Sequence, residues 1–217
     1  MPLIRYRNLI LAASLLLCLA VAIPAQDSIE YRLLKTPDYQ VFEDGVTPRA
    51  RVRANYYKTS EKDQWGVSPG QVSIEYGIPV WKAEYDTLFQ KMPAGKRWRL
   101  GSNYWTNLSS SFPFETGGRQ VKAGYYYLVL ERTDATRWNL ILLEPVEVTR
   151  RQLDPYHVNL KDSGPGIAIA LEWERVDQTA DRLQITLKLK DENPKQMEIH
   201  IRFGSYHFRS SPLAVTF

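Results

Sequence analysis

The stretch of the chain best suited to recognising a ligand runs from Trp98 to Thr106, with the sequence Trp-Arg-Leu-Gly-Ser-Asn-Tyr-Trp-Thr. Its Trp/Arg alternation before Gly-Ser-Asn is typical of a strand that ends in a turn where positive backbone φ is tolerated. In such a strand Arg99 points away from the apolar side chains on either side of it. Two aromatic residues, Tyr104 and Trp105, follow the turn.

A carboxylate on another predicted strand gives this arginine a candidate partner. Glu75 falls on the polar side of its alternating segment, so we expect Glu75 and Arg99 to meet on one polar face. Such a pair is suited to a carboxylated or hydroxylated ligand, whereas the simpler interpretation is a structural ion pair, worth little if exposed. The candidate ligand-binding residues are Glu75, Arg99, Asn103, Tyr104 and Trp105.

Two of the three histidines, His200 and His207, form a weak metal-binding pattern. If Gly204-Ser205 is a two-residue hairpin turn, Arg202 lies opposite His207, and His200 lies diagonal to it on the outward face. The two imidazoles would then reach one ion, but Arg202 repels a cation and the sequence fixes no third ligand. We therefore expect two strand histidines without a metal, and no cofactor.

The usual catalytic signatures are absent from the sequence. No serine sits in the strand-to-helix context of a nucleophile elbow, and there is no HExxH motif and no glycine-rich phosphate loop before a helix. Glycoside hydrolysis needs two carboxylates that face one cleft, and the spacing of the acidic residues does not establish such a pair. No catalytic residue is predicted.

The N-terminal segment predicts export. A basic start precedes an apolar run from Leu9 to Ala22, and small residues favour cleavage near Ala22 or Ala25. The run is shorter than the roughly 20 residues of a transmembrane helix, so no transmembrane domain is expected in the mature chain. The alternative is an uncleaved anchor. The single cysteine, Cys18, lies in this segment, so the periplasmic or secreted protein must fold without disulfides.

The net charge excludes few partners. With 28 basic and 24 acidic residues the chain carries +4, without the clustered basic footprint of a nucleic-acid-binding domain. Arg49, Arg51 and Arg53 alternate, which is typical of a solvated strand face. We expect no nucleic-acid partner.

Period-two alternation of apolar residues predicts a mainly β protein. Two segments, 125–130 and 138–143, are apolar on both faces, which implies a second layer and so an antiparallel, jelly-roll-like β-sandwich. The other predicted strands are 50–57, 72–76, 96–100, 167–173, 183–189, 197–203 and 206–209.

At most one or two short helices are expected. Apolar residues at helical spacing between Trp81 and Met92 predict an amphipathic helix that closes one end of the sandwich. The predicted organisation is a signal peptide at 1–25, a more polar and loosely attached extension at 26–60, and a β-sandwich domain at 61–217.

Four segments in this order and approximate spacing carry a resemblance to a known family: Val72–Gly77, Trp98–Asn103, Lys122–Tyr126 and Trp138–Ile141. Over residues 65–217 the chain resembles the bacterial "domain of unknown function 2911" family. The resemblance implies a secreted or periplasmic, mainly β bacterial protein and implies no activity.

The chain departs from the family pattern at Ile78, where a basic residue is common, and at Tyr104, where an acidic residue is common. Aromatic residues make up 12% of the chain, and exposed rings on a β-sandwich stack on sugars. The leading hypothesis is a non-enzymatic binding module for a glycan or envelope component. The alternatives are a hydrolase that acts on a glycan through carboxylates such as Glu75, and a purely structural envelope protein.

Overall fold

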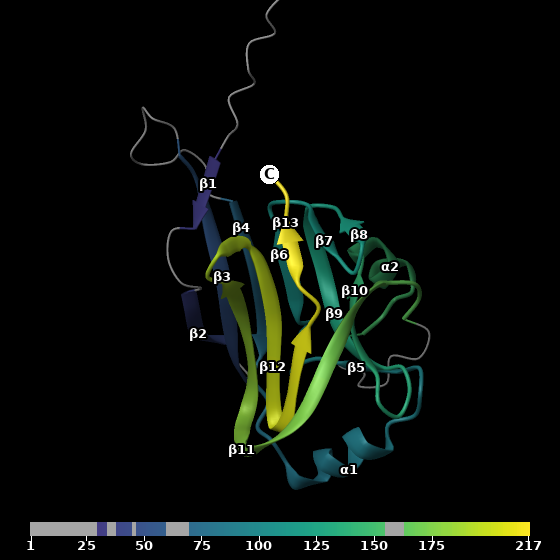
Figure 1. Ribbon diagram of the computed structural model, residues 1–217. Helices are drawn as coiled ribbons and strands as arrows, with labels where there is room; N and C mark the ends of the chain where they lie inside the picture. The colour runs from purple at the N-terminus through teal and green to yellow at the C-terminus, as the bar shows by residue number, and fades with distance from the viewer. Residues whose placement is uncertain (1–29, 34–37, 45–46, 60–69, 155–162) are drawn as a thin grey trace, which may run out of the picture.

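In the computed structural model, the described residues (30–33, 38–44, 47–59, 70–154 and 163–217) form one continuous antiparallel sheet folded into two layers (Figure 1). The sheet does not close on itself, and two short helices accompany it in the described part of the chain. The predicted fold class, a mainly β, antiparallel sandwich-like protein, is confirmed. The predicted signal peptide lies outside the described residues.

The elements follow one another along the chain with short connections. The strands are β1 (Glu30–Leu33), β2 (Asp38–Asp44), β3 (Thr47–Thr59), β4 (Gly70–Gly77), β5 (Lys96–Arg99), β6 (Asn107–Ser110), β7 (Phe114–Thr116), β8 (Arg119–Val121), β9 (Gly124–Arg132), β10 (Trp138–Leu143), β11 (Ile167–Lys190), β12 (Asn193–Ser210) and β13 (Leu213–Val215). The helices are α1 (Ala83–Lys91) and α2 (Pro145–Arg150).

The order of strands across the sheet is β1-β3-β4-β6-β9-β10-β11-β12-β13-β7-β8, with β2 also paired to β3 and β5 also paired to β9. Strands β3, β4, β6 and β9 lie in one layer, and β11, β12 and β13 cross in front of it (Figure 1). The first arm of β11 (171–175) pairs with 206–210, and its second arm (184–189) pairs with 197–202. This nested pairing is a Greek key.

β12 turns back on itself at Gly204, which confirms the predicted hairpin. The amide of Ile199 donates to Oγ of Ser210 at 2.9 Å, so the two arms lie side by side. Gly204 has φ +58, and a Cβ there would lie 2.3 Å from the Trp81 ring. Both the left-handed backbone and the close approach of Trp81 therefore require glycine.

The packed domain begins earlier than the predicted boundary at residue 61. β3 pairs with β4 over eight positions, and its inward side chains, Ala50, Val52, Ala54 and Tyr56, are all buried. The segment was expected to be loosely attached because its other side chains are polar. Alternate burial on one face explains that polarity, because the outward positions are the polar ones.

Helix α1 closes one end of the two layers, as the sequence predicts (Figure 1). Its Phe89 is buried, stacks on Tyr206 at 4.9 Å between ring centroids, and meets Trp98 edge-on at 5.2 Å. The guanidinium of Arg132 donates to the carbonyls of Phe89, Gln90 and Met92, which are the acceptors left free at the C-terminal end of a helix. Packing and capping together fix the helix in place.

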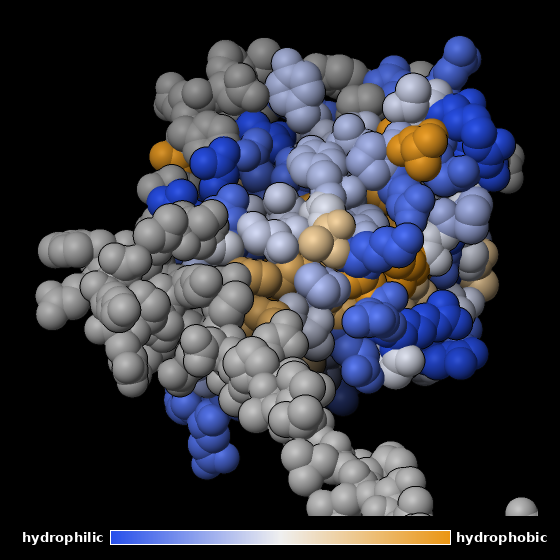
Figure 2. All heavy atoms as spheres, turned by 90° about the horizontal axis from the view of Figure 1, so that it is seen from above, coloured by the Kyte–Doolittle hydropathy of each residue, from blue (hydrophilic) through white to orange (hydrophobic). Residues whose placement is uncertain are grey.

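The opposite end carries a smaller aromatic group made of Tyr56, Phe112 and Phe217. The ammonium of Lys195 lies 4.6 Å from the centroid of the Phe217 ring. Figure 2 looks onto this end and shows a band of apolar surface flanked by polar residues. The two ends of the sandwich are therefore closed differently, one by a helix and one by aromatic side chains.

Helix α2 was not predicted from the sequence. It starts with Pro145 at a position that needs no amide donor, and its Val148 is buried against the outer face of the sheet. Val129, Ile141 and Leu143 belong to this second, smaller apolar cluster. It explains why β9 and β10 are apolar on both faces: one face meets the main core and the other meets α2.

Candidate functional site

Glu75 on β4 lies between two arginines of β3. Its Oε1 accepts from Nε of Arg49 at 3.2 Å, and its Oε2 accepts from Nη2 of Arg51 at 2.7 Å and from Nε at 3.3 Å. The strand register produces this arrangement, because Arg51 pairs directly with Glu75 while Arg49 lies one pleat further along. Both carboxylate oxygens are therefore held by guanidinium groups.

Arg49 is the buried member of this cluster, with 3% of its surface exposed. Its Nη2 donates to the carbonyl of Trp105 at 3.1 Å, and its guanidinium carbon lies 5.8 Å from the centroid of the Tyr104 ring. Within the described residues its Nη1 has no hydrogen-bond partner. A cation is thus enclosed by one carboxylate, one carbonyl and one aromatic face.

Tyrosines extend the cluster across the sheet. The register places Arg51, Glu75, Asn107 and Tyr127 in one row across β3, β4, β6 and β9. Tyr127 meets Tyr125 edge-on at 5.2 Å between ring centroids. Every second side chain of a strand points to the same side of the sheet, so these side chains build one outward face.

Two rings of this face are open to solvent. Tyr104 is 47% exposed and Tyr125 is 42% exposed. Partial burial, followed by the nearby phenol of Tyr127 and carboxylate of Glu75, raises the pKa of Tyr125 to about 12. Tyr125 is therefore a neutral hydroxyl group at any physiological pH. We call Arg49, Arg51, Glu75, Tyr104 and Tyr125 the arginine–tyrosine face.

The Trp98–Thr106 stretch forms a loop between two strands on the same edge of β9. Arg99 pairs with Val129 at the end of β5, and β6 begins at Asn107 opposite Tyr127, so residues 100–106 form the connecting loop. Nη1 of Arg99 donates to the carbonyl of Asn103 at 2.7 Å. Asn103 has φ +59, as the predicted turn requires.

The loop also packs tightly against the end of β4. A Cβ on Gly77 would lie 2.2 Å from the carbonyl oxygen of Ser102, so only glycine fits this contact. The hydroxyl of Thr106 donates to the carbonyl of Leu100 across the neck of the loop. The loop that carries Tyr104 is thus tied down at both of its ends.

The expected Glu75–Arg99 pair is replaced by two other contacts. Glu75 binds Arg49 and Arg51, whereas Arg99 closes its own loop through Asn103. The face was assigned correctly, but β5 pairs with β9 rather than with β4, and this places Arg99 elsewhere. Strand order across a sheet is not encoded in the alternation of side chains.

Three of the five predicted site residues come together. Glu75 and the Tyr104 ring lie at Arg49, and Trp105 contributes its backbone carbonyl while its own ring is buried against Tyr127. Arg99 and Asn103 shape the loop instead. The sequence analysis missed Arg49, Arg51 and Tyr125 as members of the site, although the Arg49-Arg51-Arg53 alternation marked the strand.

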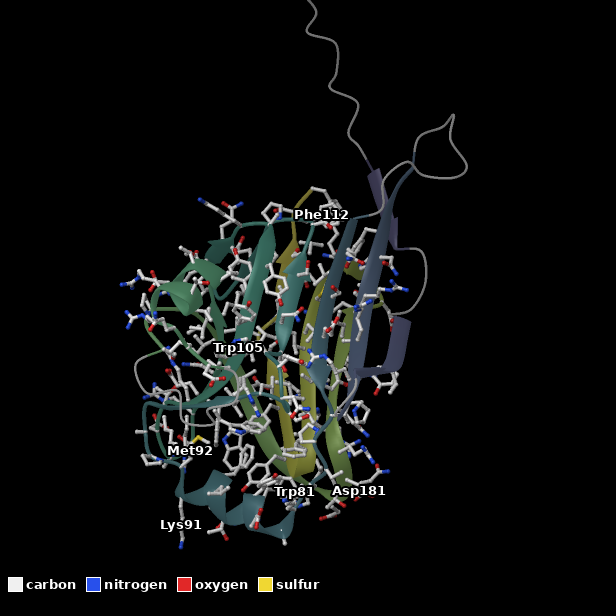
Figure 3. All side chains as sticks on the ribbon, turned by 180° about the vertical axis from the view of Figure 1, so that it is seen from behind. Trp81, Lys91, Met92, Trp105, Phe112 and Asp181 are labelled. Carbon is white, nitrogen blue, oxygen red and sulfur yellow. The ribbon has the colours of Figure 1, made fainter. Side chains whose placement is uncertain are left out.

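A cavity lies between α1 and the start of the same loop. Its volume is about 330 Å³, and apolar side chains provide most of its lining, with Lys91 and Lys96 among the residues around it. The lining includes Tyr85, Leu88, Phe89, Met92, Trp98 and Phe203. Figure 3 places Trp105 midway along the sheet, away from Lys91 and Met92 at the α1 end. We call this the α1 pocket.

A second polar cluster lies on the outer face of β11 and β12. Nδ1 of His200 lies 3.1 Å from Nε2 of His207, and Glu198 and Glu174 contact the other nitrogens of these rings. Burial lowers the pKa of His200. No group of three or more His, Cys, Asp or Glu side chains with metal-binding geometry occurs among the residues that the structure describes.

Comparison with known families gives one match. Residues 58–209, more than half of the chain, match the family model described as "Protein of unknown function (DUF2911)". The chain belongs to the DUF2911 family. No curated protein matches this DUF2911 chain, and no solved structure matches it.

The matched region includes Glu75, the Trp98–Thr106 loop, α1 and both histidines of the β11–β12 cluster. Arg49 and Arg51 precede it, so two arginines outside the matched region hold the carboxylate inside it. In the described part of this DUF2911 protein, no helix has the length and hydrophobicity needed to cross a membrane.

Proposed function

We propose that this DUF2911 protein is an exported, non-enzymatic binding protein and that a glycan of the bacterial envelope binds to its arginine–tyrosine face. The observation that carries the proposal is the exposure of two rings, Tyr104 at 47% and Tyr125 at 42%, beside a fixed Arg–Glu–Arg cluster. Rings of this kind stack on the apolar face of a pyranose.

The polar groups beside the rings match the hydroxyl groups of a sugar. The Arg51 side chain is 39% exposed, so its guanidinium is able to donate to a hydroxyl or carboxylate of a ligand. The phenol of Tyr125 is protonated and both donates and accepts. Two exposed rings beside several polar groups on one face of the sheet favour an extended ligand over a small enclosed one.

The ion pairs of Glu75 favour binding over hydrolysis. Both of its oxygens accept from arginines, so both are already engaged by partners within the protein. Glycoside hydrolysis also requires a second carboxylate about 5–10 Å away. The partners of Glu75 are cations, which supports a positioning role.

The α1 pocket supports a second candidate ligand, a small amphipathic anion. Its volume of about 330 Å³ lies within the range of small-molecule sites, and its lining is mostly apolar. Lys91 and Lys96 supply positive charge beside that apolar surface. A carboxylate or phosphate attached to a ring or a short chain has the complementary chemistry.

Thermal unfolding of the purified protein against envelope glycans and amphipathic acids tests both candidates. A ligand at 100 times its Kd stabilises the folded state by about 2.7 kcal/mol, which raises Tm by roughly 5–10 °C. We expect a glycan to give this shift, and we expect Tyr104→Ala with Tyr125→Ala to abolish it. Both rings are exposed, so the double variant should remain folded.

Lys91→Glu with Lys96→Glu is the matched control, because both lysines are exposed and lie at the α1 pocket. A shift lost in this variant but kept in the tyrosine variant would assign the ligand to the α1 pocket. Absence of any shift across the panel would contradict the binding function and favour a structural envelope protein.

Export is tested separately. We expect N-terminal sequencing of the protein recovered outside the cytoplasm to begin just after Ala22 or Ala25. An intact Met1 on that protein would contradict the cleaved signal peptide.

A further inference from the structure

Four side chains on the outer face of β11 and β12 form a continuous chain of polar contacts. Oε2 of Glu198 lies 3.3 Å from Nε2 of His200, and Oε1 of Glu174 lies 3.0 Å from Nδ1 of His207. Between them, Nδ1 of His200 lies 3.1 Å from Nε2 of His207. The order is therefore carboxylate, imidazole, imidazole, carboxylate.

The two carboxylates determine which ring nitrogens carry hydrogen. An ionised carboxylate only accepts, so the hydrogen sits on Nε2 of His200 and on Nδ1 of His207. In a neutral imidazole the remaining nitrogen is then a lone pair. Nδ1 of His200 and Nε2 of His207 thus leave two lone pairs 3.1 Å apart, and either a shared proton or a metal ion bound by both rings relieves their repulsion.

We infer that this pair is a binding site for a divalent transition-metal ion of the zinc and copper type, with Nδ1 of His200 and Nε2 of His207 as its protein ligands. Metal–nitrogen distances of about 2.0–2.1 Å at a tetrahedral ion place two nitrogens about 3.3 Å apart, close to the observed contact. Histidine ligands to metals usually donate their other N–H to a carboxylate, as both rings do here.

The surroundings fit such an ion. Each histidine side chain is 17% exposed, so water can complete the coordination from the solvent side. The guanidinium of Arg202, expected to repel a cation, donates instead to the carbonyl of Gln178 at 2.6 Å. Lys188 is a further cation near His200, and the carboxylates of Glu174 and Glu198 offset its charge.

Titration of the full-length purified protein with Zn²⁺ in a calorimeter, and with Cu²⁺ by electron paramagnetic resonance, tests the site. We expect one equivalent of each ion and two nitrogen donors in the Cu²⁺ spectrum. His207→Gln and His200→Gln should each abolish binding, and circular dichroism should show that both variants fold. Glu174→Gln should weaken binding by about 10- to 100-fold, as for other carboxylates behind a ligand.

Two controls separate this site from other metal-binding groups. His157→Gln removes the remaining histidine of the chain, and Glu172→Gln removes an exposed carboxylate that pairs with Arg209 on the same strands. Both variants should bind as the unmodified protein does. Binding that survives both His200→Gln and His207→Gln, or no stoichiometric binding at all, would overturn the proposal and leave a pair that only shares a proton.

Discussion

The two outer faces of the sandwich carry polar clusters of opposite composition. On the β3–β4 side a carboxylate lies between two arginines, one of them 3% exposed. On the β11–β12 side two histidines lie between two carboxylates, and the contact at the centre joins two ring nitrogens. In the first cluster both oxygens of Glu75 are held by arginines, whereas the second is the proposed site of a cation. Burial explains the difference, because a buried charge must be paired within the protein.

Removing the buried arginine should produce the largest loss of stability. Arg49→Met leaves Glu75 with one partner and the Trp105 carbonyl without its donor, and we expect a loss of about 3 kcal/mol in the free energy of unfolding. Arg51→Met is the matched control, because its side chain is 39% exposed and such pairs contribute about 1 kcal/mol or less. Urea unfolding measures both. Equal losses would mean that burial does not distinguish the two arginines.

The next largest loss of stability is expected when one carboxylate on each face is neutralised. Glu75→Gln leaves Arg49 buried beside a neutral amide, so a loss of about 1.5–3 kcal/mol is expected. In metal-free buffer, Glu174→Gln should cost about 1 kcal/mol or less, since Glu174 is 55% exposed. A Glu174 variant less stable than the Glu75 variant would reverse the comparison.

The Tyr104 ring provides a finer test of how Arg49 is enclosed. Tyr104→Leu keeps an apolar side chain but removes the π face over the guanidinium, and such contacts are worth about 0.5–1 kcal/mol at exposed sites. Tyr104→Phe keeps the face and should unfold at the same urea concentration as the unmodified protein. A loss of stability in the phenylalanine variant would show that the hydroxyl group, not the ring, matters.

The smallest effect on stability is expected in a turn that belongs to neither face, and this turn serves as the baseline for the comparison. In the β9–β10 turn, the amide of Thr136, followed by the guanidinium of Arg137, holds the pKa of Asp134 well below its usual range. A depressed folded-state pKa stabilises the fold above the unfolded value of about 3.9, and this contribution is lost as the pH falls. Asp134→Asn should lower Tm slightly at pH 7, and the difference should vanish on acidification. A difference that persists at low pH would contradict this.

The fold was largely predictable because its signals are local. Alternation at Leu183–Leu189 and Met197–Phe203 marked strands, Gly204-Ser205 marked the hairpin, and the Trp81–Met92 spacing marked α1. The structure contains all of these. Short pieces such as β7, β8 and α2 escaped prediction, because three to six residues do not display a period.

The candidate site was predicted less well because it depends on which strands are neighbours. Glu75 was assigned to the correct face, but the partner of β4 is β3, so its arginines come from residues that looked like solvated positions. Arg49 and Arg53 are alike in the sequence pattern, yet Arg49 is buried because the loop that carries Tyr104 and Trp105 lies over it. The sequence of a strand does not show which distant loop will cover it.

The nested pairing of β11 and β12 also affects the entropy that the chain loses as it folds. The turn at Gly204 joins arms that are neighbours in sequence, so that hairpin closes a short loop. The pair Leu171 and Ser210 closes a loop of 210 − 171 = 39 residues, and this loop is effectively shortened once the arms between them have paired. Pairings between distant residues slow folding, since the entropy of loop closure is lost before the contacts are gained. The Greek key therefore contains one pairing, between the outer arms of β11 and β12, that costs more loop-closure entropy than the hairpin at Gly204.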